Sequence, residues 1–374
     1  MKIGIVKPIS GGIINATASI ALVQRALICA TLSDSMTFIR CNERPDEITA
    51  TINSLKSQGA KIRYDGNGYQ IDPIKLPESG QGFATDDSTH GYTGQNKRGE
   101  YCLPGRVAYQ TISGLFFTLP LQSGASKIVV KGKVEYKPYI DMTLDTLEQF
   151  GIKVEQELRN DGGMVYKITG GQVFKTPGTI EVDGDWTNSA FWLCAAAISG
   201  EGIICSNINR YSRQCDKDVV NILERFGAAT AYRGDSVAVR RTRLRSIRID
   251  AAETPDIVPA LAAVASVTEG KTVIYNAERV GLYENGMLKK ISSVLTALGA
   301  DVVMNKDGLD IQGKLKLQGG TVSSFDDPRI VMMTAIASGV CEDIVAINDA
   351  NAVSKVYPDF IEDFRKLGGV IQRV

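Results

Sequence analysis

The side chains that could carry acid–base chemistry in this chain are carboxylates, lysines and tyrosines, because its 374 residues include a single histidine. That histidine, His90, lies in the polar and glycine-containing stretch 85–99. A histidine in such surroundings is expected to be a solvated loop residue. We therefore expect any proton transfer to use Asp, Glu, Lys or Tyr rather than imidazole.

The cysteines are the other side chains that could bind a metal or form covalent bonds. They are odd in number and lack the paired spacing of a zinc site. Such scattered cysteines are typical of reduced, mostly buried thiols. The sequence therefore predicts neither a structural disulfide nor a metal site. The seven cysteines are Cys29, Cys41, Cys102, Cys194, Cys205, Cys215 and Cys341.

The overall charge is balanced, with 42 Lys plus Arg and 42 Asp plus Glu. This balance argues against a general nucleic-acid binder, which would carry a basic surface. The apolar run at the N-terminus is too short for a signal peptide, and no later run approaches the roughly 18 residues that span a bilayer. We expect a protein of the cytoplasm with no membrane partner, and a length of 374 residues favours two domains.

Five amphipathic stretches, each closed by glycine, are the elements that must position the chemistry. Apolar residues recur at spacings of three and four, which predicts helices, and the glycine suits the left-handed position that follows a helix end. A short strand-like run follows each one, so the repeated unit is a mixed α/β segment of about 70 residues. The closing glycines are Gly59, Gly151, Gly227, Gly299 and Gly368.

One interval between the glycines is irregular. Residues 66–105 are polar and glycine-rich and show no amphipathic helix, so a helical copy is absent there. Turn signals at 9–12 and 233–236 mark candidate crossings between domains. We predict one domain of residues 1–12 plus 238–374 with three complete units, and a nested domain of residues 13–237 whose second unit is reduced.

Several strings of this sequence resemble the enolpyruvyl transferases, and specifically the EPSP synthase family. The most specific is YKPYIDMT at 136–143, which is similar to the family's Ser-Lys-Pro-Tyr-Ile-Asp-Met-Thr run. The others occur in the family's order and cover most of the chain apart from the irregular interval. They are GDWTNSAFW at 184–192, PDIVP at 255–259, DDPRIVM at 326–332 and SKVYPDF at 354–360.

The resemblance implies a fold and a reaction. The fold is α/β, with two domains of repeated βαβαββ units around buried helices, and here one unit is reduced. The reaction moves the carboxyvinyl group of phosphoenolpyruvate to a hydroxyl of shikimate 3-phosphate and releases phosphate. It requires no metal and no organic cofactor. Its partners are small anionic substrates, which need arginine, lysine and hydroxyl donors.

The resemblance also implies roles for individual residues. Asp256 matches the aspartate that accepts the proton of the attacking hydroxyl, and Glu284 matches the glutamate that transfers a proton at the vinyl carbon. The expected substrate-binding residues are those that match the family's anion-binding positions. They are Arg25, Gln110, Tyr139, Arg329 and Lys355.

Other positions depart from the family's pattern. Ile20 and Ala21 replace a lysine and a serine at the first anion-binding helix, and we expect Ile20 to pack on a helix face. Ala108, Tyr109 and Tyr136 replace three serines that bind phosphate. Around Glu284, three cations of the family are absent from residues 281–287. The predicted site is therefore degenerate.

Three interpretations of function remain open. The first is a carboxyvinyl transferase of the EPSP synthase type. The second is a repurposed enzyme that acts on a less charged or aromatic substrate, because tyrosines would make the site more apolar. The third is a noncatalytic binding or partner protein that keeps the fold. The sequence indicates neither an oligomeric state nor a physiological partner.

Overall fold

The computed structural model describes residues 1–74, 98–198, 200–278, 280 and 286–373. Their contacts divide the chain into two compact units. Unit 1 comprises Met1–Thr17 and Gly184–Val374, and unit 2 comprises Ala18–Asp183. The chain therefore leaves unit 1 after residue 17 and returns at residue 184, whereas we had predicted a nested domain of residues 13–237.

The described helices fall into two sets. The helices of the first set are largely buried: α1 (Ile20–Thr31), α3 (Tyr109–Thr118), α5 (Trp186–Ile198), α7 (Val258–Ala265) and α10 (Pro328–Ala337). The second set is amphipathic: α2 (Asp46–Ser57), α4 (Lys137–Gln149), α6 (Val219–Phe226), α9 (Met287–Ala297) and α11 (Phe360–Lys366). Five short 3₁₀ helices accompany them: η1 (Leu119–Leu121), η2 (Cys215–Asp218), η3 (Pro255–Ile257), η4 (Ser338–Val340) and η5 (Ala350–Lys355).

The strands of the described residues form five four-stranded sheets, three in unit 1 and two in unit 2. Unit 1 contains β2 (Gly12–Asn15), β11 (Ile203–Ser206), β13 (Ser236–Arg240) and β12 (Ala229–Arg233); β14 (Arg248–Asp250), β15 (Lys271–Tyr275), β17 (Gly308–Gln312) and β16 (Asp301–Asn305); and β18 (Gly320–Ser323), β19 (Val345–Asn348), β1 (Ile3–Lys7) and β20 (Val370–Arg373). Unit 2 contains β10 (Thr179–Glu181), β3 (Thr37–Arg40), β5 (Gly68–Asp72) and β4 (Lys61–Tyr64); and β6 (Glu100–Pro104), β7 (Ala125–Lys131), β9 (Met164–Thr169) and β8 (Glu155–Leu158).

All five sheets share one topology. In each, the first strand pairs in parallel with the second, and the third and fourth strands follow in antiparallel order. A buried helix precedes the second strand and an amphipathic helix follows it. The predicted repetition of α/β units is therefore confirmed in the described part of the chain.

The boundary at residue 184 follows from the packing of α5. This helix is almost wholly buried and lies beside α7 and α10 in the core of unit 1. The strand after it, β11, pairs in parallel with β2 from the start of the chain. The unit that closes at Gly227 thus belongs to unit 1, and not to the nested domain where we had placed it.

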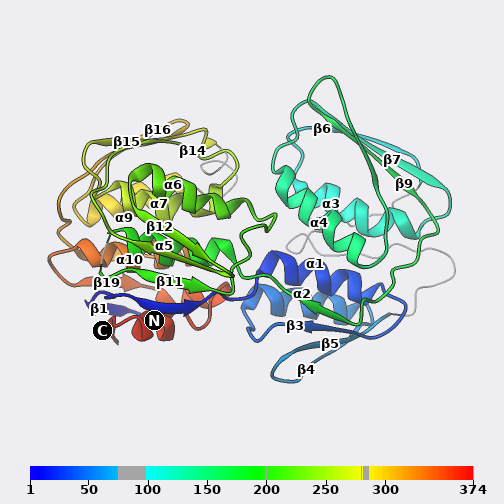
Figure 1. Ribbon diagram of the computed structural model, residues 1–374, viewed down its shortest axis with the longest axis horizontal. Helices are drawn as coiled ribbons and strands as arrows, with labels where there is room; N and C mark the ends of the chain where they lie inside the picture. Colours follow the sequence, from blue (N-terminus) through cyan, green and yellow to red (C-terminus); the bar gives the residue numbers. More distant parts are fainter. Residues whose placement is uncertain (75–97, 199, 279, 281–285, 374) are drawn as a thin grey trace. The chain divides into compact units, whose positions relative to one another are not determined.

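Small side chains allow the buried helices of unit 1 to approach closely. In α7 all eight residues are buried and four are alanine, while the last turn of α5 contains three consecutive buried alanines, residues 195–197. Figure 1 shows α5, α7 and α10 inside the layers of unit 1. This arrangement brings the beginnings of α7 and α10 together, which positions the site described below.

The closing glycines adopt the conformation that the sequence predicts. All five have positive φ, from +76° at Gly151 to +103° at Gly59 and Gly227. In each case the N–H of the residue after glycine donates to a carbonyl five residues earlier, as Ala60 does to Leu55. This bond is part of the Schellman motif, which ends a helix and turns the chain toward the next strand.

We expect Gly59→Ala to lower the free energy of unfolding by about 1 to 2 kcal/mol, because a Cβ disfavours the left-handed backbone. The nearest atom to such a Cβ would be 4.0 Å away, so the loss would come from the backbone and not from a clash. Chemical denaturation measures the change. The control is Ser57→Ala in the same helix turn, where we expect less than about 0.5 kcal/mol. An equal loss in both variants would contradict this account.

The described part of unit 2 contains one sheet fewer than unit 1. The predicted reduced unit falls between β5 and β6. Residues 75–97 of this interval, which include Glu78 and His90, lie outside the described residues.

All seven cysteines are free thiols. Among the described helices, none combines the length and apolar character that crossing a membrane requires.

Candidate active site in two clusters

The predicted residues Asp256 and Arg329 lie at the starts of two neighbouring buried helices of unit 1. Asp256 is in η3, directly before α7, and Arg329 is the second residue of α10. The Arg329 Nη1 donates a hydrogen bond of 2.8 Å to the Asp256 Oδ1. Two residues that are 73 positions apart in the sequence are thereby joined.

Asp327 fixes the orientation of Arg329. It is the N-cap of α10, and its Oδ1 accepts the backbone N–H of Arg329 at 3.1 Å and the Nε–H at 3.3 Å. Its Oδ2 also accepts from the Lys290 Nζ of α9 at 3.2 Å. Burial alone would raise the pKa of Asp327, but the charges and hydrogen bonds of Arg329 and Lys290 outweigh it and lower the pKa below its usual value.

A tight turn before α10 orients the next cation. Phe325 and Asp326 both have left-handed backbones, with φ of +52° and +55°, and the Asp327 N–H donates to the Ser324 carbonyl at 3.0 Å. Such a conformation is strained in residues other than glycine. It places Asp326 against Lys355, whose Nζ lies 2.7 Å from the Asp326 Oδ2 and 2.8 Å from the Asp326 carbonyl oxygen.

These side chains form a group with equal numbers of cations and carboxylates, which we call the unit 1 cluster. It comprises Asp256, Lys290, Asp326, Asp327, Arg329 and Lys355. Its positive charges are already paired with carboxylates, so a phosphorylated ligand has to compete with those carboxylates. Glu284, the other predicted catalytic residue, lies outside the described residues.

In unit 2, the predicted residue Arg25 is fully buried. Its Nε donates to the Thr143 hydroxyl at 2.9 Å, and its Nη atoms donate to the carbonyls of Ala21 at 2.7 Å and Tyr139 at 3.0 Å. No carboxylate of the described residues pairs with it, and burial lowers its pKa. Arg25 thus joins α1 to α4 through neutral acceptors.

Three tyrosines form an aromatic cluster beside this arginine. The rings of Tyr109 and Tyr139 stack at 4.7 Å, Tyr136 meets both edge-on at 6.2 Å, and the Arg25 guanidinium lies 5.9 Å from the Tyr109 ring centre. Tyr136 has a left-handed backbone, with φ of +54°. Gln110, half-buried, follows Tyr109 at the start of α3. We call Arg25, Tyr109, Gln110, Tyr136, Tyr139 and Thr143 the unit 2 cluster.

The first helix of unit 2 shows the effect of the apolar substitutions. Ile20 opens α1 and is buried, with 9% of its surface exposed. This is the packing position that we expected for an isoleucine. Ala21 contributes only its carbonyl oxygen, which accepts from Arg25. The N-terminal turn of α1 therefore presents no charged side chain of its own.

Within each unit, the structure brings one pair of the predicted residues into direct contact, while Lys355 pairs with Asp326 instead and Gln110 is placed beside Tyr109 by the sequence. Asp256 contacts Arg329, and Arg25 contacts Tyr139. Sequence reasoning missed Lys290 as a member of the site. It also missed the N-cap role of Asp327, which the order Asp327-Pro328 signals, since aspartate is a preferred cap and proline a preferred first residue.

A family model described as EPSP synthase (3-phosphoshikimate 1-carboxyvinyltransferase) matches residues 93–364. A Clostridium perfringens protein named 3-phosphoshikimate 1-carboxyvinyltransferase is 34% identical over 96% of this chain and 97% of its own length. A protein of the same name from Clostridium kluyveri is 33% identical over 96% of each. The alignment with the former spans 416 positions, so that relative has residues without a counterpart among these 374.

Two solved structures are similar in fold. EPSP synthase from Acinetobacter baumannii superposes with a TM-score of 0.80 at 19% identity, and each chain is covered to 99%. The enolpyruvyl transferase NikO from Streptomyces tendae gives a TM-score of 0.76 at 16% identity, covering 99% of this chain and 98% of its own. At these identities the likeness concerns the fold alone.

Proposed function

Since the chain belongs to the EPSP synthase (3-phosphoshikimate 1-carboxyvinyltransferase) family, we propose that it transfers the carboxyvinyl group of phosphoenolpyruvate to shikimate 3-phosphate. The family membership and the α/β fold agree with the sequence prediction. In this proposal the unit 1 cluster binds phosphoenolpyruvate and carries the proton transfer. The unit 2 cluster binds shikimate 3-phosphate, with fewer hydrogen-bond donors than the family has at these positions. The protein works in the cytoplasm, a compartment that suits seven free thiols.

The Asp256–Arg329 contact is the observation that carries this proposal. A catalytic base is most useful when it lies beside the cation that holds the other reactant. The 2.8 Å hydrogen bond orients the Asp256 carboxylate before a substrate arrives. When Arg329 binds an anionic substrate instead, Asp256 is available to accept the hydroxyl proton.

The substrate hydroxyl oxygen attacks C2 of phosphoenolpyruvate, its proton passes to Asp256, and the vinyl carbon gains a proton. The resulting tetrahedral intermediate loses phosphate and a proton from the methyl group, which restores the vinyl double bond. We assign the transfer at the vinyl carbon to Glu284 on the family pattern alone. Arg329 and Lys355 would stabilise the anionic phosphate and carboxylate groups.

The unit 2 cluster supplies less to an anionic acceptor. Arg25 is fully buried next to Tyr109 and already donates to three neutral acceptors. Gln110 and Tyr139 remain as donors to the sugar-like ring, while Tyr109 and Tyr136 stand where the family has serines. We therefore propose weak binding of shikimate 3-phosphate and slow turnover.

A direct assay tests the proposal. Phosphate release from phosphoenolpyruvate is measured with and without shikimate 3-phosphate, and calorimetry measures the binding of each. Release that depends on shikimate 3-phosphate supports the proposal, and a turnover of roughly 1 per second or faster would show that the altered cluster is not limiting. Binding of neither compound would overturn it and favour a noncatalytic protein.

A second function is favoured by the stacked tyrosines. Tyr109 and Tyr136, which stand where the family has phosphate-binding serines, form an aromatic surface together with Tyr139. Such a surface suits a less charged or aromatic hydroxyl compound better than a phosphorylated one. Phosphate release from phosphoenolpyruvate that responds to an aromatic alcohol, such as 3-hydroxybenzyl alcohol, and not to shikimate 3-phosphate would establish this function.

We expect Ile20→Lys combined with Ala21→Ser to tighten the binding of shikimate 3-phosphate about tenfold or more, because an ammonium and a hydroxyl return to the start of α1. Calorimetry measures the dissociation constant. The matched control is Ile20→Met with Ala21→Ser, which restores the hydroxyl without the charge. A folded lysine variant with unchanged affinity would show that this helix start does not face the substrate.

A further inference from the structure

A pocket of unit 1 lies at the opposite end of α7 from the unit 1 cluster. Its volume is about 470 Å³, which is in the range of small-molecule sites. Asp256 precedes α7, whereas Val267 and Glu269 follow it, and eight helical residues span about 12 Å. The two sites are therefore separate. The lining also includes Ile198 from the end of α5 and Leu315.

The charged side chains of this pocket differ in what they already bind. Arg243 forms an ion pair of 2.9 Å with Glu269, and the Lys314 Nζ donates to the Gly299 carbonyl at 2.6 Å. Arg241, in contrast, makes no hydrogen bond or ion pair with any described residue. One guanidinium at the pocket therefore remains available to an anion.

Arg241 belongs to the most basic segment of a chain whose net charge is zero. Residues 240–248 contain five arginines. A local excess of positive charge in an otherwise neutral protein raises the local concentration of anions. The partial negative charge at the ends of α5 and α7, together with Glu269, opposes a highly charged ligand. These two effects favour a ligand with a single negative charge.

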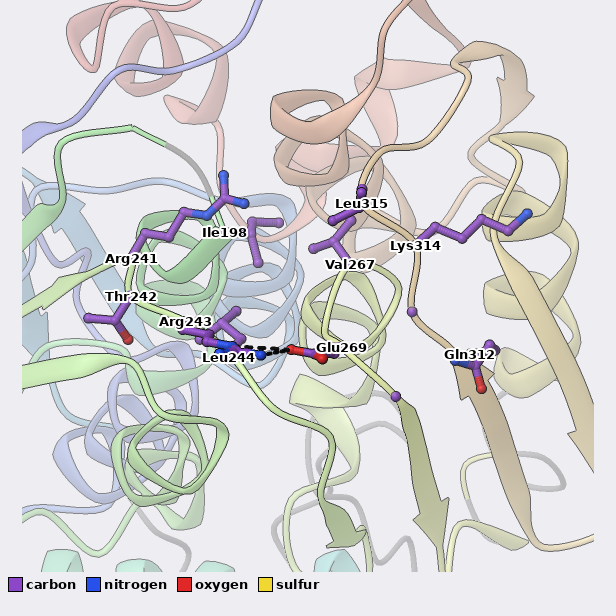
Figure 2. Close-up of a pocket in the computed structure, with 12 residues that line it drawn as sticks. Ile198, Arg241, Thr242, Arg243, Leu244, Val267, Glu269, Gln312, Lys314 and Leu315 are labelled. Carbon is purple, nitrogen blue, oxygen red and sulfur yellow. Dashed lines mark hydrogen bonds and ion pairs between the residues drawn. The ribbon is translucent and has the colours of Figure 1, made fainter.

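The rest of the lining is apolar. Figure 2 shows Ile198 near Arg241, with Val267 and Leu315 close by. Leu315 lines this pocket and is 95% exposed, so the described residues of unit 1 leave its side chain open to solvent. Leu244 completes the apolar surface. A ligand that covers these side chains has to carry a hydrocarbon body as well as its charge.

We propose that this pocket binds a small amphipathic carboxylate, with an aromatic or branched hydrocarbon body. The carboxylate pairs with the Arg241 guanidinium, whose planar N–H groups match two carboxylate oxygens. The body covers Ile198, Val267 and Leu315. This site is distinct from the proposed carboxyvinyl transfer, and it does not depend on that function.

The test uses 3-phenylpropionate as the probe on the full chain. We expect binding of one molecule with a dissociation constant of about 0.1 to 1 mM in calorimetry. Two matched compounds separate the contributions of charge and body. The uncharged 3-phenylpropionamide and inorganic phosphate are each expected to bind at least about tenfold more weakly.

Two arginine variants locate the site. Arg241→Gln is expected to weaken 3-phenylpropionate about tenfold or more, because it removes the charge-assisted hydrogen bonds. The control is Arg240→Gln, the neighbouring exposed arginine that does not line the pocket, and we expect less than about a twofold change. Both residues are exposed, so neither change should disturb folding.

Hydrogen exchange provides a measurement that does not depend on variants. The probe should protect backbone amides of residues 241–244 and 266–270. The proposal is overturned if 3-phenylpropionate does not bind at about 10 mM, or if Arg241→Gln and Arg240→Gln weaken its binding equally. It is also overturned if 3-phenylpropionamide binds as tightly as 3-phenylpropionate. Protection confined to residues 326–329 would likewise refute it, because the probe would then occupy the unit 1 cluster.

Discussion

Arg329→Gln is expected to lower kcat/KM for phosphoenolpyruvate by about 10²- to 10⁴-fold. The guanidinium supplies charge-assisted hydrogen bonds to an anionic substrate, and it also neutralises Asp256 and Asp327. Glutamine can replace neither contribution. Two adjacent carboxylates would then repel the substrate instead of positioning it. Steady-state phosphate release measures the loss of kcat/KM. If turnover is too slow to measure, calorimetry compares the affinity of the wild-type protein and of Arg329→Gln for phosphoenolpyruvate.

Two further variants define what this loss means. Arg329→Lys keeps the charge but loses the fork of donors, so we expect an intermediate value. Arg240→Gln removes an exposed arginine outside both clusters and should leave kcat/KM within about twofold. A folded Arg329→Gln protein that keeps more than about a tenth of the wild-type value would contradict the assignment of phosphoenolpyruvate to the unit 1 cluster.

The second large effect concerns stability. Asp327→Asn is expected to lower the free energy of unfolding at pH 7 by about 2 to 4 kcal/mol. The side chains of Asp327, Lys290 and Arg329 are 9%, 15% and 20% exposed, so solvent screens this network only partly. Asparagine keeps the N-cap hydrogen bond, and the loss therefore reports the charge alone. Urea denaturation measures it.

The pH dependence of this loss has a definite sign. The folded pKa of Asp327 lies below its unfolded value, which is about 3.9. Its contribution to stability is therefore fully present above that unfolded value and disappears as the pH falls through the folded pKa. The difference between the wild-type protein and Asp327→Asn should shrink below about pH 4.

The matched control is Asp326→Asn in the adjacent position. The Asp326 carboxylate is 72% exposed and pairs with Lys355 at the surface, so we expect a loss below about 1 kcal/mol. Equal losses in the two variants, or a difference for Asp327→Asn that does not change with pH, would show that the buried network does not stabilise α10.

The sequence predicted the repeated units well because their signals are local. A helix with an apolar face and a glycine at its end depends on neighbouring residues only, and Gly227 and Gly299 both adopt the expected positive φ. The family strings added the residues of the site. The contact between Asp256 and Arg329 follows from two such strings lying at the starts of adjacent helices.

The boundary between the units could not be predicted in the same way. The apolar run of α5 shows that the helix is buried, but it does not show which core the helix joins. That choice depends on the parallel pairing of β2 with β11, whose residues lie nearly 200 positions apart. Lys290 was missed for a related reason, because its ion pair with Asp327 joins two helices and leaves no local pattern.

The pairing of β1 has a consequence for the order in which this protein is made. β1 is synthesised long before β19 and β20, the two strands with which it pairs. β2 waits in turn for β11. Unit 2 is a continuous segment, so it can fold during translation, while the first two strands wait with unsatisfied edges. Synthesis of β19 and β20 is therefore the step that allows this sheet of unit 1 to form.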